Sequence, residues 1–185
     1  MKNQNLSIST RDMVFTALFT AVLCVVAPFT IPIGPVPLSL ATFIIYLASG
    51  TLNWKLGALS VFLYVMIGAV GVPVFSNFGA GFPRIMGPTG GFIMGYVPCA
   101  LAAGLIIGVF KRKIWAYALG MAIGTALLYT FGLIWFMILT ENSLAVSLAL
   151  CVTPFLPGDT AKIIAACVVA PQLRKVIERT AMGRA

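Results

Sequence analysis

The sequence predicts an all-α integral membrane protein, a bundle of six transmembrane helices with both termini in the cytoplasm. Of its 185 residues, 61% are apolar, the mean hydropathy is +1.06, and only 12 basic and 4 acidic side chains are present. Water-soluble domains do not have this composition. The apolar runs are long enough to cross a bilayer, and the basic residues fall at both ends and on alternate connections.

The chain is predicted to form one membrane domain, residues 13–176, between cytoplasmic tails at 1–12 and 177–185. The first tail lacks the cleavage pattern of a secretory signal, so we expect it to stay attached. The first span, residues 13–33, is an uncharged run of 21 residues. At about 1.5 Å of rise per residue it covers roughly the 30 Å of a hydrocarbon core.

The second and third spans are separated by an aromatic residue and a cation. Residues 38–54 form a short second span that ends at Trp54, and Lys55 follows it. Trp and Lys are typical of the membrane interface. Residues 56–75 form the third span, which Gly71 and Pro73 interrupt near its end.

The fourth span, residues 92–110, is closed by the basic cluster 111–113, and the fifth covers residues 115–139. The last crossing is predicted to be discontinuous, with a short segment at 144–152 and then a helix from 158 to about 170. One unbroken helix is disfavoured because two prolines and a glycine would lie inside it.

Two connections are rich in glycine and proline. Residues 31–38 predict a stiff extended loop, and residues 76–91 predict a long loop without helix. A loop of that length is usually functional or disordered, and its aromatic residues argue against disorder. The four cysteines stand singly in apolar segments and are interpreted as small core residues.

Basic residues set the orientation. They lie in the first tail, at Lys55, at 111–113 and in the last segment, so all fall on one side of a six-span protein. That side is the cytoplasm. The net charge of +8 follows from this topology and suits contact with anionic membrane lipid. No interleaving of aromatic and basic residues points to nucleic acid.

The first span carries two small residues, Ala17 and Ala21, four positions apart. This spacing permits close approach of another helix. Two interpretations stay open, namely packing inside this chain and docking onto a separate membrane protein.

The stretch Pro154–Lys162 places two charges inside an apolar run. Pro157 suits the first turn of a helix, so Asp159 and Lys162 fall in that turn, three residues apart and on one face. Charge at membrane depth is unfavourable by about 2.5 to 3.5 kcal/mol per residue, so both should face a cavity or each other. A ligand site and a buried ion pair between helices are the two alternatives.

Further candidate ligand contacts lie near the same external level. Each external connection has a Gly-Pro or Pro-Gly step before the chain re-enters the membrane, at 34–35, 87–88 and 157–158. Such helix starts offer free N–H groups to oxygen ligands. Asn77, Arg84 and Trp135 lie near this level, although an Arg in a loop is often simply solvated.

Three motifs carry a resemblance to a known family. They are GPVPLSLATF at 34–43, GPTGGF at 87–92 and PFLPGDTAK at 154–162. In this order in a short six-span chain they resemble the BioY family, the biotin-specific substrate-binding (S) components of energy-coupling factor (ECF) transporters of the prokaryotic cell membrane. The match extends over nearly the whole chain.

The resemblance implies high-affinity capture of biotin from outside, with Asp159 and Lys162 on the ureido ring and Arg84 or Asn77 near the carboxylate. The reverse wiring, with Lys162 on the carboxylate, stays open. Phe43, Trp135, Gly90 and Gly91 are expected to form the walls. The resemblance also implies that Ala17 and Ala21 contact the transmembrane coupling protein, that ATPase subunits supply energy, and that the two external loops act as a lid.

Two other function classes are weighed against this. A self-sufficient secondary transporter or facilitator would need a coupling-ion site and usually two related halves, and no convincing internal repeat is found. An enzyme would have only Asp159 and Lys162 for chemistry. With no histidine, no metal-ligand cluster and no Walker A motif, we expect no enzymatic activity, no metal and no cofactor.

Overall fold

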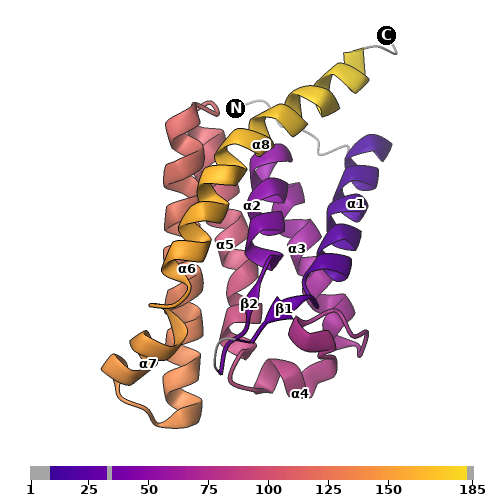
Figure 1. The fold of residues 1–185 in the computed structure, drawn as a ribbon. Coiled ribbons are helices and arrows are strands. Elements are labelled where there is room, and N and C mark those ends of the chain that lie inside the picture. Colours follow the sequence, from indigo (N-terminus) through magenta and orange to yellow (C-terminus); the bar gives the residue numbers. More distant parts are fainter. Residues whose placement is uncertain (1–8, 33–34, 183–185) are drawn as a thin grey trace, which may run out of the picture.

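The structure is a computed structural model that describes residues 9–32 and 35–182. Most of the described chain is helical, and helices of eleven residues or more form the bundle in Figure 1. They are α1 (Thr10–Val26), α2 (Ala41–Thr51), α3 (Trp54–Ala69), α5 (Gly90–Val109), α6 (Ile114–Thr140) and α8 (Leu156–Met182). These six helices confirm the predicted all-α membrane bundle.

Lengths vary among these helices. By length and apolar composition, α5 and α6 can each span a membrane alone, and α7 (Leu144–Cys151) together with α8 can form a third, bent span. Helices α2 and α3, with 11 and 16 residues, are apolar but shorter. Large apolar side chains such as Val25, Phe131 and Ile164 are exposed on the outer helix faces, as expected where lipid surrounds a protein.

Helices α5 and α6 lie against each other along their lengths because glycines let them approach closely. A Cβ at Gly120 would lie 2.8 Å from the carbonyl oxygen of Ala103, and one at Gly124 would lie 2.8 Å from that of Cys99. Real Cβ atoms do not approach oxygen this closely, so both positions require glycine in this packing. Of the four free cysteines, Cys99 and Cys151 are buried and the other two half-buried, in agreement with their interpretation as packing residues.

The structure corrects the prediction for the two external connections. Residues 31–38 do not form a plain extended loop, because β1 (Thr30–Ile31) pairs antiparallel with β2 (Leu38–Ser39) in a short hairpin. The expectation of no helix in residues 76–91 is also wrong: a 3₁₀ turn (Ser76–Phe78) and α4 (Gly81–Met86) lie there. Gly81 has a φ of +75°, a conformation that favours glycine, so it starts α4 instead of preventing it.

The last crossing is broken as predicted, with a bend of 49° between α7 and α8. Its second helix, however, does not end near residue 170 but continues through Pro171 to Met182. Contacts with α2 stabilise this extension: Ala170 packs beside Gly50, and Arg174 donates a hydrogen bond to the Thr51 carbonyl oxygen at 3.2 Å. The first helix likewise begins at Thr10 and ends at Val26, earlier than residue 33.

Helices therefore extend into both segments predicted as tails. Residues 1–8 and 183–185, and Gly34 of the first Gly-Pro step, lie outside the described residues. In Figure 1 the start of α1 and the end of α8 lie at one end of the bundle, and the hairpin, α4 and α7 lie toward the other. That other end holds the candidate site.

Candidate ligand-binding site

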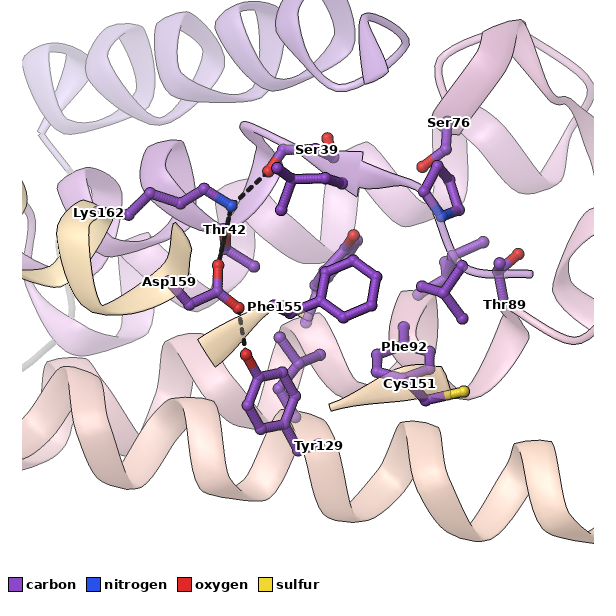
Figure 2. Close-up of a pocket in the computed structure, with 16 residues that line it drawn as sticks. Ser39, Thr42, Ser76, Thr89, Phe92, Tyr129, Cys151, Phe155, Asp159 and Lys162 are labelled. Carbon is purple, nitrogen blue, oxygen red and sulfur yellow. Dashed lines mark hydrogen bonds and ion pairs between the residues drawn. The ribbon is translucent and has the colours of Figure 1, made fainter. Parts of the chain in front are cut away.

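A cavity lies where the hairpin and α2 meet α5, α6 and the break between α7 and α8 (Figure 2). Side chains from all these elements line it, which makes it a product of the tertiary fold. The lining residues are Val36, Pro37, Leu38, Ser39, Thr42, Ser76, Thr89, Phe92, Ile93, Tyr96, Leu128, Tyr129, Cys151, Phe155, Asp159 and Lys162.

Among the described residues that line the cavity, Asp159 is the only acidic one, and it is 5% exposed. It lies in the first turn of α8, where the positive end of the helix dipole favours a carboxylate. Its Oδ1 accepts hydrogen bonds from Thr42 at 3.1 Å and Lys162 at 2.8 Å, and its Oδ2 accepts one from the Tyr129 hydroxyl at 2.6 Å. Charge-assisted bonds of this kind stabilise a buried carboxylate.

Lys162 is held as completely as Asp159. Its ammonium donates to the Ser39 carbonyl oxygen at 2.6 Å, to Thr42 Oγ1 at 3.1 Å and to Asp159 Oδ1 at 2.8 Å. An ammonium has three N–H donors, and these three acceptors account for all of them. The structure is therefore compatible with both interpretations of the pair. It is an ion pair that joins α8 to α2, and it is also part of the wall of a cavity that could hold a ligand.

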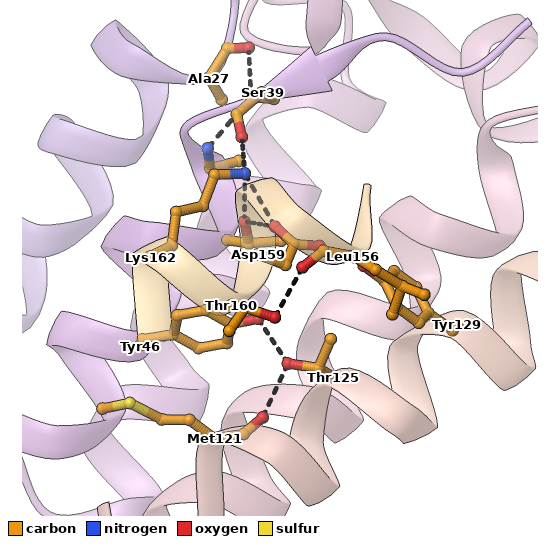
Figure 3. Close-up of polar contacts among 12 residues, drawn as sticks. Ala27, Ser39, Tyr46, Met121, Thr125, Tyr129, Leu156, Asp159, Thr160 and Lys162 are labelled. Carbon is orange, nitrogen blue, oxygen red and sulfur yellow. Dashed lines mark hydrogen bonds and ion pairs between the residues drawn. The ribbon is translucent and has the colours of Figure 1, made fainter. Parts of the chain in front are cut away.

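Hydrogen bonds behind the pair fix its surroundings (Figure 3). Ser39 Oγ donates to the Ala27 carbonyl oxygen at 3.2 Å and accepts from the Ala41 amide at 3.0 Å, which ties the hairpin to the ends of α1 and α2. Deeper in the bundle, the buried hydroxyls of Tyr46 and Thr125 are hydrogen-bonded to each other between α2 and α6. Ser39, whose carbonyl oxygen accepts from Lys162, is thus itself fixed in place.

The polarity of the cavity lining changes with distance from the Asp159–Lys162 pair. Its middle is apolar and aromatic, formed by Phe92, Phe155 and neighbouring side chains of α5 and α6. In Figure 2, Ser76 and Thr89 lie across this apolar middle from Asp159 and Lys162. The Thr89 hydroxyl is buried and has no hydrogen-bond partner among the described residues. The cavity therefore has a charged end, an apolar middle and a hydroxyl-bearing end.

The cavity is narrow, and a wider hollow lies beside it. The space open to the centres of water-sized spheres is about 50 Å³ in the narrow cavity and about 590 Å³ in the wider hollow. Leu38, Ser39 and Lys162 line both, so strand β2 forms the partition between them. A shift of the hairpin would join the two spaces.

Two predicted site residues lie near the cavity without lining it. Asn77 is exposed, has a left-handed φ of 56°, accepts a hydrogen bond from Thr30 Oγ1 at 2.6 Å and lines the wider hollow. Arg84 is half-buried on α4 and donates to the carbonyl oxygen of Ser76 at 3.2 Å. Its Nε is buried with no partner among the described residues. Because Ser76 lines the cavity, Arg84 is one residue removed from it.

The predicted wall residues hold the helices together at this end and do not line the cavity. Phe43 packs against the core from α2. Gly90 and Gly91 let the start of α5 approach Ile85 and Trp135, where a Cβ would lie 1.6 Å from the Ile85 carbonyl oxygen or 2.3 Å from Trp135 Cβ. The Trp135 indole donates to the Gly87 carbonyl oxygen at 3.0 Å.

Sequence reasoning missed several residues that contact the pair. Ser39 and Thr42 lie in the first of the three motifs, where a hydroxyl recurs in an apolar stretch, and that signal could have identified them. Tyr129 lies on α6, 30 positions before Asp159, and nothing in its local sequence indicates that contact.

Ala17 and Ala21 are both exposed on the outer face of α1, while Thr16 and Thr20 of the same helix are buried. Thr20 donates to the Ser60 carbonyl oxygen of α3 at 3.0 Å. The buried face of α1 is therefore the threonine face, and packing of the two alanines inside this chain is not observed in the described part. Contact with a separate membrane protein stays a prediction.

Comparisons with known proteins agree with the geometry. The sequence matches the BioY family over residues 1–179. It is 34% identical over 170 residues to the biotin transporter BioY of Thermotoga maritima, covering 91% of this chain and 99% of that one. It is 32% identical over 174 residues to the biotin transporter BioY of Rhodobacter capsulatus, covering 86% and 91%.

A crystal structure of the S-component for biotin from an ECF-type ABC transporter has the same fold. Its TM-score is 0.84 at 26% sequence identity, and the match covers 95% of each chain. Sequence and fold thus agree over nearly the full length, and this chain belongs to the BioY family.

Proposed function

We propose that this protein is the biotin-capturing S component of an ECF-type importer in a prokaryotic plasma membrane. One observation carries the proposal. The Asp159–Lys162 pair, with all its hydrogen bonds made, forms one end of a cavity whose middle is apolar and whose far end carries hydroxyl groups. Relatives described as biotin transporters, and a fold shared with an S-component for biotin, support it.

Biotin matches this order of polar and apolar groups. Its ureido ring has two N–H donors and one carbonyl acceptor, its thioether ring is apolar, and its valerate chain ends in a carboxylate. We propose that Asp159 accepts from the ureido N–H groups and Lys162 donates to the ureido oxygen. The reverse wiring, with Lys162 on the carboxylate, leaves the ureido ring to the Ser76 and Thr89 end.

Biotin can bind to Asp159 and Lys162 only by replacing hydrogen bonds that these side chains already make within the protein. Every donor of Lys162 is taken, and both oxygens of Asp159 have partners, so biotin must replace at least one of these contacts. A site of buried polar groups strongly rejects analogues that leave those groups unpaired. This exchange favours a ligand that carries donors and an acceptor together, as the ureido group does.

The cavity must also widen to hold biotin, because its present free space suits a few waters at most. We propose that the hairpin and the segment of residues 76–91 act as the external lid. Arg84 or Asn77 then contacts the valerate carboxylate, Arg84 being within one residue of the cavity.

Energy is proposed to come from other chains. The 185 residues contain no Walker A sequence, so a P-loop ATPase activity is not expected in them. We propose that ATPase subunits and a transmembrane coupling protein complete the importer, that the coupling protein contacts Ala17 and Ala21, and that lipid surrounds the remaining outer faces.

The test is to purify the chain alone in detergent, release any bound small molecule and identify it by mass, then titrate the emptied protein with radiolabelled biotin. The proposal predicts biotin as the released molecule and saturable binding of one biotin per chain. An emptied, folded protein that binds no biotin would contradict it. Ion-driven biotin uptake by the chain alone in liposomes would instead indicate a secondary transporter.

A further inference from the structure

Another hollow, lined largely by polar residues, lies at the opposite end of the bundle from the cavity, near the start of α1 and the end of α8 (Figure 1). Its volume is about 380 Å³, and it is formed by the start of α1, the α2–α3 junction, the end of α5 and the second half of α8. The residues that line it are Arg11, Asp12, Phe15, Thr51, Leu52, Asn53, Trp54, Leu56, Gly108, Arg112, Arg174, Ile177 and Glu178. The distribution of basic residues assigns this end to the cytoplasm.

Two guanidinium groups meet at the end of α2. Arg112 donates to the carbonyl oxygens of Gly50 at 3.2 Å and Leu52 at 3.3 Å, and Arg174 donates to that of Thr51 at 3.2 Å. These bonds cap the negative end of the helix dipole. Each guanidinium has five N–H donors, so most of them are not used in capping.

Burial and the neighbouring Arg174 cation disfavour the charge of Arg112 at the end of α2. Burial, and then the nearby Arg174 cation, lower the pKa of Arg112 from its ordinary value, and Tyr117 and Glu178 offset this only in part. Lys111 and Arg112 both have left-handed backbone conformations, with φ of 51° and 58°, which are unfavourable for these residue types. Arg174 has a carboxylate partner, Glu178 at 2.6 Å, but no ion pair to Arg112 is found in the part of the chain that the structure describes.

Further unpaired donors border the same hollow. Thr51 is 3% exposed, and its Oγ1 has no hydrogen-bond partner among the described residues. Helix α3 begins here, and its N-cap residue Asn53 makes no side-chain cap, so the amides of the first turn lack intrahelical acceptors. A helix start with free amides favours an anion.

The charges that line the hollow leave an excess of one cation. Arg11, Arg112 and Arg174 stand against Asp12 and Glu178, and both carboxylates already lie beside an arginine, Asp12 at 3.8 Å from Arg11 and Glu178 beside Arg174. Trp54 lies at the opening turn of α3 and Lys55 follows it, a pairing typical of the lipid headgroup level. An oxyanion would supply the countercharge and the acceptors that this hollow lacks.

We propose that this hollow is a binding site for a phosphate group, held by Arg112, Arg174, Arg11, the Thr51 hydroxyl and the first amides of α3. The phosphate comes either from the headgroup of an anionic phospholipid in the inner leaflet or from inorganic phosphate. Its binding joins the starts of α1 and α3 to α8, so it stabilises the cytoplasmic end of the bundle.

The test uses the full chain in an uncharged maltoside detergent. It is titrated with dioctanoyl phosphatidylglycerol, with dioctanoyl phosphatidylcholine and with sodium phosphate, and Tm and the dissociation constant are measured. Arg11→Gln and Thr51→Val each remove one predicted phosphate contact. Arg179→Gln is the matched control, because it removes the same charge as Arg11→Gln from an exposed position that does not line the hollow.

We expect phosphatidylglycerol to raise Tm and phosphatidylcholine to have little effect. Loss of a charge-assisted hydrogen bond should weaken binding about tenfold in Arg11→Gln, with a smaller loss in Thr51→Val and none in Arg179→Gln. Without lipid, Thr51→Val should melt like the unmodified chain, because the lost hydroxyl has no protein partner. A Tm rise with phosphate alone would identify the free ion as a sufficient ligand, whereas a rise only with phosphatidylglycerol would identify the lipid.

Three results would overturn the proposal. In the first, neither phosphatidylglycerol nor phosphate binds, as expected if the hollow receives an acidic segment of another protein. In the second, phosphatidylcholine binds as well as phosphatidylglycerol. In the third, Arg11→Gln and Arg179→Gln weaken binding equally, which would reduce the effect to general surface charge.

Discussion

Asp159 and Lys162 form a mostly buried ion pair, with side chains 6% and 11% exposed. Removing one partner of such a pair leaves an uncompensated charge and costs about 3 to 5 kcal/mol, whereas replacing both by apolar groups is often close to neutral. If only Asp159 or only Lys162 is replaced, a loss of biotin binding therefore cannot be distinguished from a loss of folding. Variants that remove a neutral neighbour, or both charges together, separate the two effects.

Tyr129 is such a neighbour, because its hydroxyl alone donates to Asp159 Oδ2 among the described residues. In Tyr129→Phe the ring keeps its packing and the carboxylate loses one donor. We expect biotin affinity to fall roughly tenfold, in line with about 1 to 3 kcal/mol for a buried acceptor left without a partner. Equilibrium dialysis with labelled biotin measures the change.

The adjacent residue provides the control for this prediction. Thr130 is exposed, and its hydroxyl bonds only to the Ala126 carbonyl oxygen of its own helix, so Thr130→Val should bind biotin normally. Equal affinities of Tyr129→Phe and Thr130→Val would mean that Tyr129 does not hold Asp159 in the bound state.

At the scale of elements, the hairpin is the partition between the narrow cavity and the wider hollow. Among the described residues it has two residue pairs, Thr30 with Ser39 and Ile31 with Leu38, and a two-stranded ribbon of this size is marginally stable by itself. Weak pairing is what a lid requires if it is to move for ligand entry.

A disulfide across the hairpin tests this movement. Thr30→Cys with Ser39→Cys places two thiols on directly paired residues, at a separation that a disulfide can bridge. With the disulfide formed, we expect biotin association to slow at least several-fold, and reduction to restore it. The unmodified chain, with its four free cysteines, is carried through the same oxidation as the control. Unchanged association in the oxidised variant would exclude the hairpin as the lid.

The elements also indicate how far the sequence could predict this structure. Apolar runs and prolines predicted the helices and the broken last crossing, because both effects are local. The hairpin and α4 were missed because glycine and proline mark where a long helix stops and do not specify what forms next. The continuation of α8 past Pro171 depends on α2, through Ala170 and Arg174, and such contacts are not visible in a local pattern.

In the candidate site, too, the sequence indicated the residues with a local signal and missed those that depend on contacts between distant helices. Asp159 and Lys162 could be identified because charge is rare in an apolar run, and they are three residues apart on one helix. Their partners Thr42 and Tyr129 come from helices far away in sequence. Trp135, Gly90 and Gly91 lie at the same end of the bundle as the pair, but they pack against Ile85, Gly87 and each other and do not line the cavity.

At the scale of the whole molecule, we propose two surfaces with two tasks. The cavity at the hairpin end binds biotin, and the small-residue face of α1, which is directed outward, meets the coupling protein. We expect Ala17→Leu with Ala21→Leu to leave biotin binding by the isolated chain unchanged, because neither residue packs in the bundle. Biotin uptake in cells that supply the coupling protein and ATPases should fall at least tenfold, since bulk prevents close helix approach.

Helix α6 offers a matched control for this variant. Ala122 and Ala126 are also four residues apart and exposed, so Ala122→Leu with Ala126→Leu adds the same bulk to another outer face. Normal uptake by this control and loss in the α1 variant would assign docking to α1. Equal uptake by the two variants would exclude Ala17 and Ala21 as the docking contact.

The central claim is that biotin binds at the Asp159–Lys162 pair, and the most direct measurement is the biotin dissociation constant of a variant that lacks both charges. Asp159→Asn with Lys162→Met should fold, because no buried charge is left unpaired, and it should bind biotin at least a hundredfold more weakly, since two charge-assisted bonds are worth about 3 kcal/mol or more. Asp12→Asn, at the cytoplasmic end, is the control and should bind normally. A folded double variant that binds biotin as tightly as the unmodified protein would contradict the account.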